Sequence, residues 1–95
     1  MLVEKTFNKN DTVTLKLTSG EELVGRYVTE DFTSITLYKP MVLIANGQGI
    51  GLGPYLLTVS PEDSVKFFMS SIATIAKTEK NMATQYISST TGINV

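Results

Sequence analysis

The residue that most constrains the fold of this chain is Gly25, which falls at an apolar position of a strand-like run. The alternation of apolar and polar residues places Leu23 and Tyr27 on either side of it, with the period of a half-buried strand. A glycine inside a strand marks a bulge, a sharp bend or a close backbone approach. The pattern therefore predicts a strand that curls, as in a small barrel. A second alternating run precedes it across a turn that ends at Gly20, and its apolar positions are Val13, Leu15 and Leu17.

Two more strands are predicted in the middle of the chain. Residues 35–38 form a third strand, which Lys39-Pro40 interrupts because proline cannot donate a ladder hydrogen bond. Apolar residues then continue to Asn46-Gly47, one of the strongest hairpin signals, and the chain returns over residues 48–52 as a fourth strand. Residues 55–59 are almost continuously apolar, which favours a fifth strand covered on both faces or by a neighbouring chain.

The apolar period changes after Ser60. Ser60-Pro61 followed by two acidic residues is typical of a helix start. Apolar residues then recur in steps of three and four as far as Tyr86, so the sequence predicts a C-terminal helix over residues 61–86. Residues 87–95 are rich in Ser and Thr and are expected to form a flexible tail. Residues 1–10 form an N-terminal arm that is open to three readings: a helical turn, an edge strand or a docked extended segment.

Composition excludes several classes of function. The 95 residues are enough for one domain, and the chain contains neither Cys nor His. This rules out a disulfide framework, thiolate metal sites and Ser-His-Asp or Cys-His catalysis. The adjacent acids Glu30 and Asp31 would point to opposite faces of a strand, which argues against a cooperating acid–base pair. With no apolar run near the ~20 residues of a membrane span, we expect a soluble cytoplasmic protein that is not an enzyme and uses no metal or cofactor.

The same residues carry a family resemblance. The pattern G-x-x-L-x-G-x-Y over residues 20–27, followed by Asp31, resembles the first motif of the Sm/LSm RNA-binding proteins, including the bacterial Hfq branch. The continuation over residues 31–37 is similar to the Hfq-like form. A weak counterpart of the second motif, L-G-x-x-L-x-x-V, lies at residues 52–59. The resemblance covers residues 11–61 and leaves the C-terminal third without a counterpart.

This resemblance implies a mainly β fold: a small, strongly bent, five-stranded antiparallel barrel over residues 11–60, with an added C-terminal helix. It also implies a cyclic homo-oligomer of roughly five to seven subunits, in which the last strand pairs with the next subunit. The expected interface residues are Tyr55, Leu56, Leu57 and Val59. The loops that would line the pore and hold single-stranded RNA carry Asp31, Phe32, Thr33, Ser34, Leu52 and Gly53.

Three departures from the family pattern leave two functions open. Ser34 or Ile35 stands where the family has the asparagine that reads uracil, Leu52 replaces the motif arginine, and the Hfq-like histidine has no counterpart. Losing a pore cation removes phosphate contacts, which supply most of the affinity for RNA. Phe32 could still stack on an unpaired base. One hypothesis is therefore an RNA-binding ring, and the other is a ring-shaped assembly protein that has lost the uridine pocket.

Overall fold

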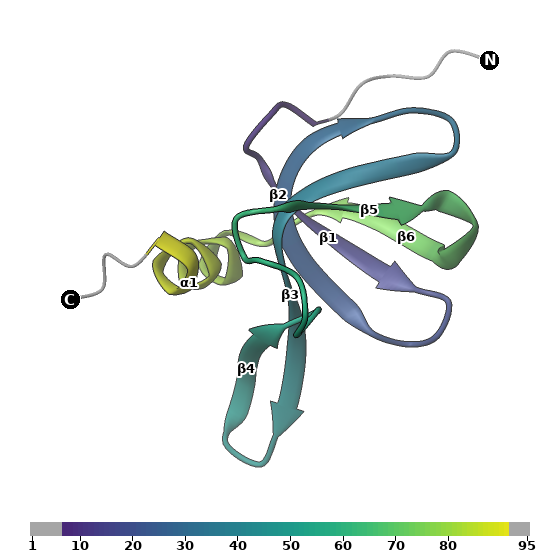
Figure 1. Ribbon diagram of the computed structural model, residues 1–95. Helices are drawn as coiled ribbons and strands as arrows, with labels where there is room; N and C mark the ends of the chain where they lie inside the picture. Colours follow the sequence, from purple (N-terminus) through teal and green to yellow (C-terminus); the bar gives the residue numbers. More distant parts are fainter. Residues whose placement is uncertain (1–6, 92–95) are drawn as a thin grey trace.

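The computed structural model describes residues 7–91, which form one antiparallel sheet and a C-terminal helix (Figure 1). The sheet has six strands in the order β4-β3-β2-β1-β6, and β5 also pairs with β3. The mainly β class and the C-terminal helix are confirmed, but the sheet is open and has six strands in place of the expected five. The elements are β1 (Thr12–Leu17), β2 (Glu22–Glu30), β3 (Ser34–Asn46), β4 (Gly49–Pro54), β5 (Ser64–Phe68), the short 3-10 helix η1 (Met69–Ser71), β6 (Ile72–Lys77) and α1 (Lys80–Thr91).

The opening hairpin follows the sequence prediction. β1 and β2 pair with Leu15 opposite Leu23, and the turn between them contains Gly20 at φ +111°, a conformation that favours glycine. The close approach predicted at Gly25 is also present. A Cβ atom there would lie 3.0 Å from Leu37 Cδ1, and the register between β2 and β3 shifts at this point.

Strand β3 changes partners at Lys39-Pro40. Residues 34–38 pair with β5 and residues 41–46 pair with β4, while β2 pairs with both parts of β3. Lys39 has φ +52°, so the strand leaves its extended path at the predicted interruption and then continues to Asn46. The predicted turn at Asn46-Gly47 is confirmed, since Asn46 pairs with Gly49 across a two-residue loop.

The fifth strand predicted over residues 55–59 is wrong. This segment is an irregular connection between β4 and β5. Pro54 ends the preceding strand, and Leu57 is 84% exposed, so the run lacks the two-sided cover that its continuous apolar pattern implied. Tyr55 turns toward the core and packs against Phe67, with their ring centroids 5.4 Å apart.

The helix predicted over residues 61–86 is also wrong for most of its length. The helix-start signal forms only a turn, in which Ser60 Oγ accepts a hydrogen bond from the Glu62 N–H at 3.2 Å. β5 and β6 follow it, pairing with β3 and β1 respectively. Their residues are largely β-branched or aromatic, and these pack well in strands. The long-range pairing therefore prevails over a periodicity that also fits a helix.

The single α-helix lies later in the chain than predicted. It begins after Glu79, whose carboxylate accepts hydrogen bonds from the N–H groups of Asn81 and Met82, both at 3.0 Å. It extends to Thr91, so residues 87–91 are helical rather than part of a flexible tail. Its anchor is Tyr86, which is fully buried and donates to the carbonyl oxygens at the bend of β3.

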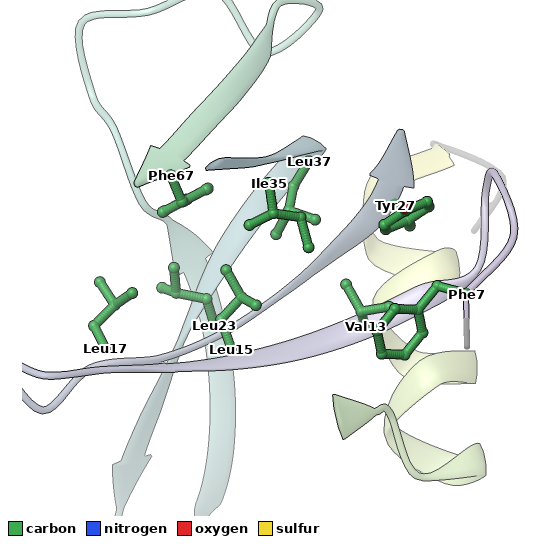
Figure 2. Packing of buried hydrophobic residues seen from close by; sticks show 9 residues of the cluster. All are labelled: Phe7, Val13, Leu15, Leu17, Leu23, Tyr27, Ile35, Leu37 and Phe67. Carbon is green, nitrogen blue, oxygen red and sulfur yellow. The ribbon is translucent and has the colours of Figure 1, made fainter. Parts of the chain in front are cut away.

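The core lies inside the curved sheet. Figure 2 shows nine buried hydrophobic residues that converge from β1, β2, β3, β5 and the segment before β1. Phe7 packs against Tyr27 with the ring centroids 5.7 Å apart, which matches the docked reading of the N-terminal arm. Residues 1–6 of the arm and residues 92–95 of the predicted tail lie outside the described residues. Within residues 7–91, no helix is long and apolar enough to span a membrane.

Candidate nucleic-acid interface

The turn between β2 and β3 is organised by one carboxylate oxygen. Asp31 Oδ1 accepts hydrogen bonds from the N–H groups of Thr33 and Ser34, both at 2.9 Å, and from their hydroxyl groups at 3.1 and 3.3 Å. The Asp31 N–H in turn donates to the Ser34 carbonyl at 2.9 Å. The hydrogen bond from the Thr33 N–H has the largest effect among the contacts that lower the pKa of Asp31 below its ordinary value. Asp31, Thr33 and Ser34 thus form a fixed turn.

Phe32 stands at the tip of this turn with 96% of its surface exposed. The residues on both sides of it are held by the Asp31 hydrogen bonds, so the backbone is fixed while the ring projects into solvent. The ring therefore contributes nothing to the core. An aromatic face presented in this way can stack on an unpaired base, the usual way in which proteins grip single-stranded RNA.

A second exposed phenylalanine lies beside the turn. Phe68, at the end of β5, pairs with Ser34, and the Met69 N–H donates to the Thr33 carbonyl at 2.8 Å. The Phe68 side chain is 59% exposed. The sequence analysis missed Phe68 because it assigned this segment to a helix. The signal was the Phe67-Phe68 pair, in which a strand places one ring in the core and the next on the surface.

Leu52 and Gly53 do not join this end of the sheet, contrary to the sequence prediction. They lie on β4, opposite Leu43 and Val42 respectively. Val42 is eight residues beyond Ser34 on the bent β3, roughly 26 Å of strand. The connection that does lie next to the β2–β3 turn is η1, because β5 and not β4 pairs with the first half of β3.

Positive charge is sparse at this end of the sheet. Lys66 precedes Phe68 by two residues on β5, so both side chains lie on the same outer face, and it is exposed. No Lys or Arg follows until Lys77, which leaves η1 without a cation. Stacking and one lysine are therefore the means by which this surface could hold a nucleic acid.

The residues predicted to form the subunit interface divide into two groups. Tyr55 faces its own core, as described above. Leu56, Leu57 and Val59 are 38%, 84% and 38% exposed, so they offer apolar surface from a loop and not from a strand. Within residues 7–91, no group of three or more acidic residues lies close enough together to bind a metal ion.

We expect the Asp31 carboxylate to control the order of the turn. In Asp31→Ala the N–H groups of Thr33 and Ser34 lose their acceptor, and their hydrogen exchange should be several-fold faster than in the wild type. Because the folded pKa is lowered from 3.8, the hydrogen bonds are fully present above that pH and are lost as the pH falls through the folded pKa. Hydrogen exchange followed by NMR measures both effects.

The matched control is Asp31→Asn, which keeps an acceptor oxygen but does not titrate. It should retain protection at both N–H groups and lose the acid dependence. Equal exchange rates in Asp31→Ala and the wild type would show that other contacts hold the turn.

The sequence was compared with known protein families and with curated proteins. No family model matches the chain, and no curated protein is significantly similar to it.

Proposed function

We propose that this protein binds single-stranded RNA at the end of the sheet where Phe32 and Phe68 are exposed, and that it acts as a cyclic homo-oligomer with an Sm-like fold. The observation that carries the proposal is Phe32, almost completely exposed on a turn that four hydrogen bonds to Asp31 hold in place. A ring carried on an ordered backbone loses little backbone entropy on binding, so more of the stacking energy appears as affinity.

The Sm-like part of the proposal is supported by the motif over residues 20–27 and by the role of its second glycine. Gly25 lies where β2 passes close to Leu37, as a strongly curved sheet requires. The pairing of the last two strands with β3 and β1 brings η1 next to the β2–β3 turn. Two loops therefore meet at one end of the sheet, as in the proposed RNA site, although the second loop is η1 and not the Leu52-Gly53 segment that the Sm resemblance assigned.

The homo-oligomeric part is supported by unpaired strand edges. Among residues 7–91, β5 pairs only with β3, and β6 pairs only with β1. Each strand therefore has one edge with free N–H and C=O groups, which proteins usually protect or pair. Pairing between β5 of one copy and β6 of the next would satisfy both edges in a closed assembly.

Replacing Phe32 by alanine tests the RNA site. Stacking on an aromatic ring is worth about 1–3 kcal/mol per base, so we expect affinity for RNA to fall roughly 5- to 150-fold. The measurement is fluorescence anisotropy with short U-rich and A-rich RNAs at low and moderate salt. Phe32→Trp should restore binding, because the larger ring also stacks. The oligomeric mass should be the same in both variants.

The control is Ile87→Ala, which removes an exposed apolar side chain on α1, outside the β2–β3 and β5–β6 turns. It should leave the affinity unchanged. Lys66→Ala should weaken binding and reduce its salt dependence, since fewer counterions are released. Unchanged affinity in Phe32→Ala would place the RNA elsewhere on the molecule.

The sparse positive charge favours the second candidate, an assembly protein that does not bind RNA. No Lys or Arg lies in residues 67–76, which include η1. Phosphate contacts supply a large share of the affinity in most RNA complexes. Absence of binding at low salt to both U-rich and A-rich RNA, with an intact oligomer, would select this second function.

A further inference from the structure

A long segment in the middle of the chain carries no charge. Residues 40–61 contain no Asp, Glu, Lys or Arg, although charged residues make up 18% of the protein. Five of the eight large hydrophobic side chains exposed in the described part of the chain belong to this segment. They are Ile44, Ile50, Leu56, Leu57 and Val59. Depletion of charge together with exposed apolar side chains is characteristic of the core of a protein–protein interface.

Part of this segment forms an arm, residues 41–54, made of β4 and the second half of β3. The arm projects away from the rest of the sheet (Figure 1). Ile44 pairs with Gly51 and Ile50 pairs with Ala45, so the two isoleucines lie on opposite faces of the hairpin, and each is 51% exposed. A partner that packed flat against the arm would cover only one of them. Covering both requires a recess that receives the arm.

The same chain has such a recess at the base of the arm. This groove has a volume of about 450 Å³. The charge of Lys39 at its edge is already engaged, since its Nζ donates to the Thr90 carbonyl at 2.8 Å and lies 3.7 Å from Glu62 Oε2. Most of the lining is apolar and includes Pro40, Met41, Pro54, Leu56, Leu57 and Val59, while Asp63 is the second charged residue that lines the groove.

The arm cannot fill the groove of its own chain. Met41 and Pro54, which pair at the base of the arm, line the groove, whereas Asn46 and Gly49 pair at its tip. The tip is five residue steps away from the base, roughly 17 Å. An arm that fills the groove therefore belongs to another molecule. A second copy of this chain supplies an uncharged arm that is apolar on both faces, which matches the mainly apolar lining of the groove.

We infer that the arm of one copy inserts into the groove of the next copy. Arm and groove are different surfaces, so the contact is head-to-tail and forms a ring when the rotation closes. The inference rests on the homo-oligomeric part of the proposed function and adds a second contact between the copies, without which the pairing of the β5 and β6 edges does not hold the assembly together. It does not depend on RNA binding, because Phe32 precedes β3 whereas the arm tip is at the far end of that strand.

Two variants test this contact separately. Ile50→Asp places a charge on the arm and leaves the groove intact, whereas Leu57→Asp places a charge in the groove and leaves the arm intact. A buried unpaired charge is strongly unfavourable. In native mass spectrometry and sedimentation, we expect the wild type to be oligomeric and each variant alone to have the 10.4 kDa mass of one chain.

Mixing the two variants is the decisive step. The intact arm of Leu57→Asp can enter the intact groove of Ile50→Asp, so a species with one copy of each should form. No further copy can add to it. A head-to-tail contact predicts this complementation, whereas a two-fold contact between like surfaces does not. A mixture that stays monomeric over the concentrations at which the wild type assembles would overturn the inference.

The control is Phe32→Asp, which changes an exposed apolar residue outside the arm and the groove. It should keep the wild-type mass. Circular dichroism should show the wild-type fold for all three variants, because each site is at least half exposed. If Ile50→Asp had the mass of the wild-type oligomer, the arm contact would be wrong. The RNA proposal would not be affected, because the Phe32→Ala titration tests it separately. A monomeric wild type would overturn the arm contact and the ring together.

Discussion

Tyr86→Ala is expected to lower the free energy of unfolding by about 3–5 kcal/mol, the range found for deleting a buried aromatic ring. Tyr86 is fully buried, and it is the one buried residue of α1. Its hydroxyl group donates to the carbonyl oxygens of Tyr38 and Lys39 at 3.0 and 2.7 Å, at the bend where β3 changes partners. The substitution therefore detaches the helix and leaves the bend without these two hydrogen bonds.

For a domain of this size the melting temperature should fall by more than about 12 °C. Thermal and urea unfolding, followed by circular dichroism, measure the change. Ile87→Ala on the neighbouring position of α1 is the control, since its side chain is partly exposed and should cost much less. A melting temperature close to the wild-type value in Tyr86→Ala would mean that the helix is not anchored by this side chain.

The phenol of Tyr86 also makes a prediction for alkaline pH. Burial raises its pKa from 10.0 to about 12. In the unfolded chain the proton leaves at the lower value, so the stabilisation from keeping it is complete below pH 10 and is lost between about pH 10 and 12. Tyr86→Phe should make this loss shallower. At neutral pH the same variant should cost about 1 kcal/mol for the missing hydroxyl.

Gly25→Ala is expected to destabilise the protein by about 1–3 kcal/mol, and Gly25→Val by more, because both overpack the core. An added Cβ would lie 3.0 and 3.1 Å from two Leu37 side-chain atoms and 3.4 Å from Pro40 Cα. Leu37 is fully buried and Pro40 Cα belongs to the backbone at the bend, so neither neighbour can move away without disturbing the β2–β3 pairing.

Gly47→Ala is the matched control for Gly25. An added Cβ at Gly47 meets nothing within 4 Å, and its backbone needs no positive φ, so its cost should be small. Urea unfolding of the two alanine variants provides the comparison. If the two variants were equally stable, the close contact between residue 25 and Leu37 would have no cost in stability, and the prediction would be wrong.

The two exposed phenylalanines and the uncharged arm lie in two separate regions of the molecule. Phe32 and Phe68 lie at the end of the sheet where β3 begins, and the arm lies where β3 ends. β3 connects both regions and is fixed at its bend by the Tyr86 hydroxyl group. With this arrangement, the proposed RNA binding and the proposed assembly can be tested by separate mutations, as in the Phe32 and Ile50 variants.

Only the part of the candidate site whose residues are close together in the chain could be predicted from the sequence. Asp31 to Ser34 form a turn through hydrogen bonds between residues two or three apart, and the sequence identified all four residues. Phe68 comes 34 residues after Ser34 and reaches the turn only through the pairing of β5 with β3. Its sequence neighbours fitted a helical stripe, so no local pattern assigned its ring to this surface. Leu52 and Gly53 were misplaced because the weak second motif assigned them to the pore, whereas the pairing of β4 with the second half of β3 places them elsewhere.

The features that depend on neighbouring residues could be predicted correctly: the turns at Gly20 and Asn46-Gly47, the close approach at Gly25 and the break at Lys39-Pro40. The region from residue 55 to residue 77, in contrast, depends on strand pairing between residues far apart in the chain. Its apolar residues satisfy both the strand and the helix period, and the Ser60 hydroxyl group makes its hydrogen bond in a turn as readily as in a helix. The free edges of β1 and β3 resolved that ambiguity, since pairing with them satisfies backbone groups of both partners while burying Phe67.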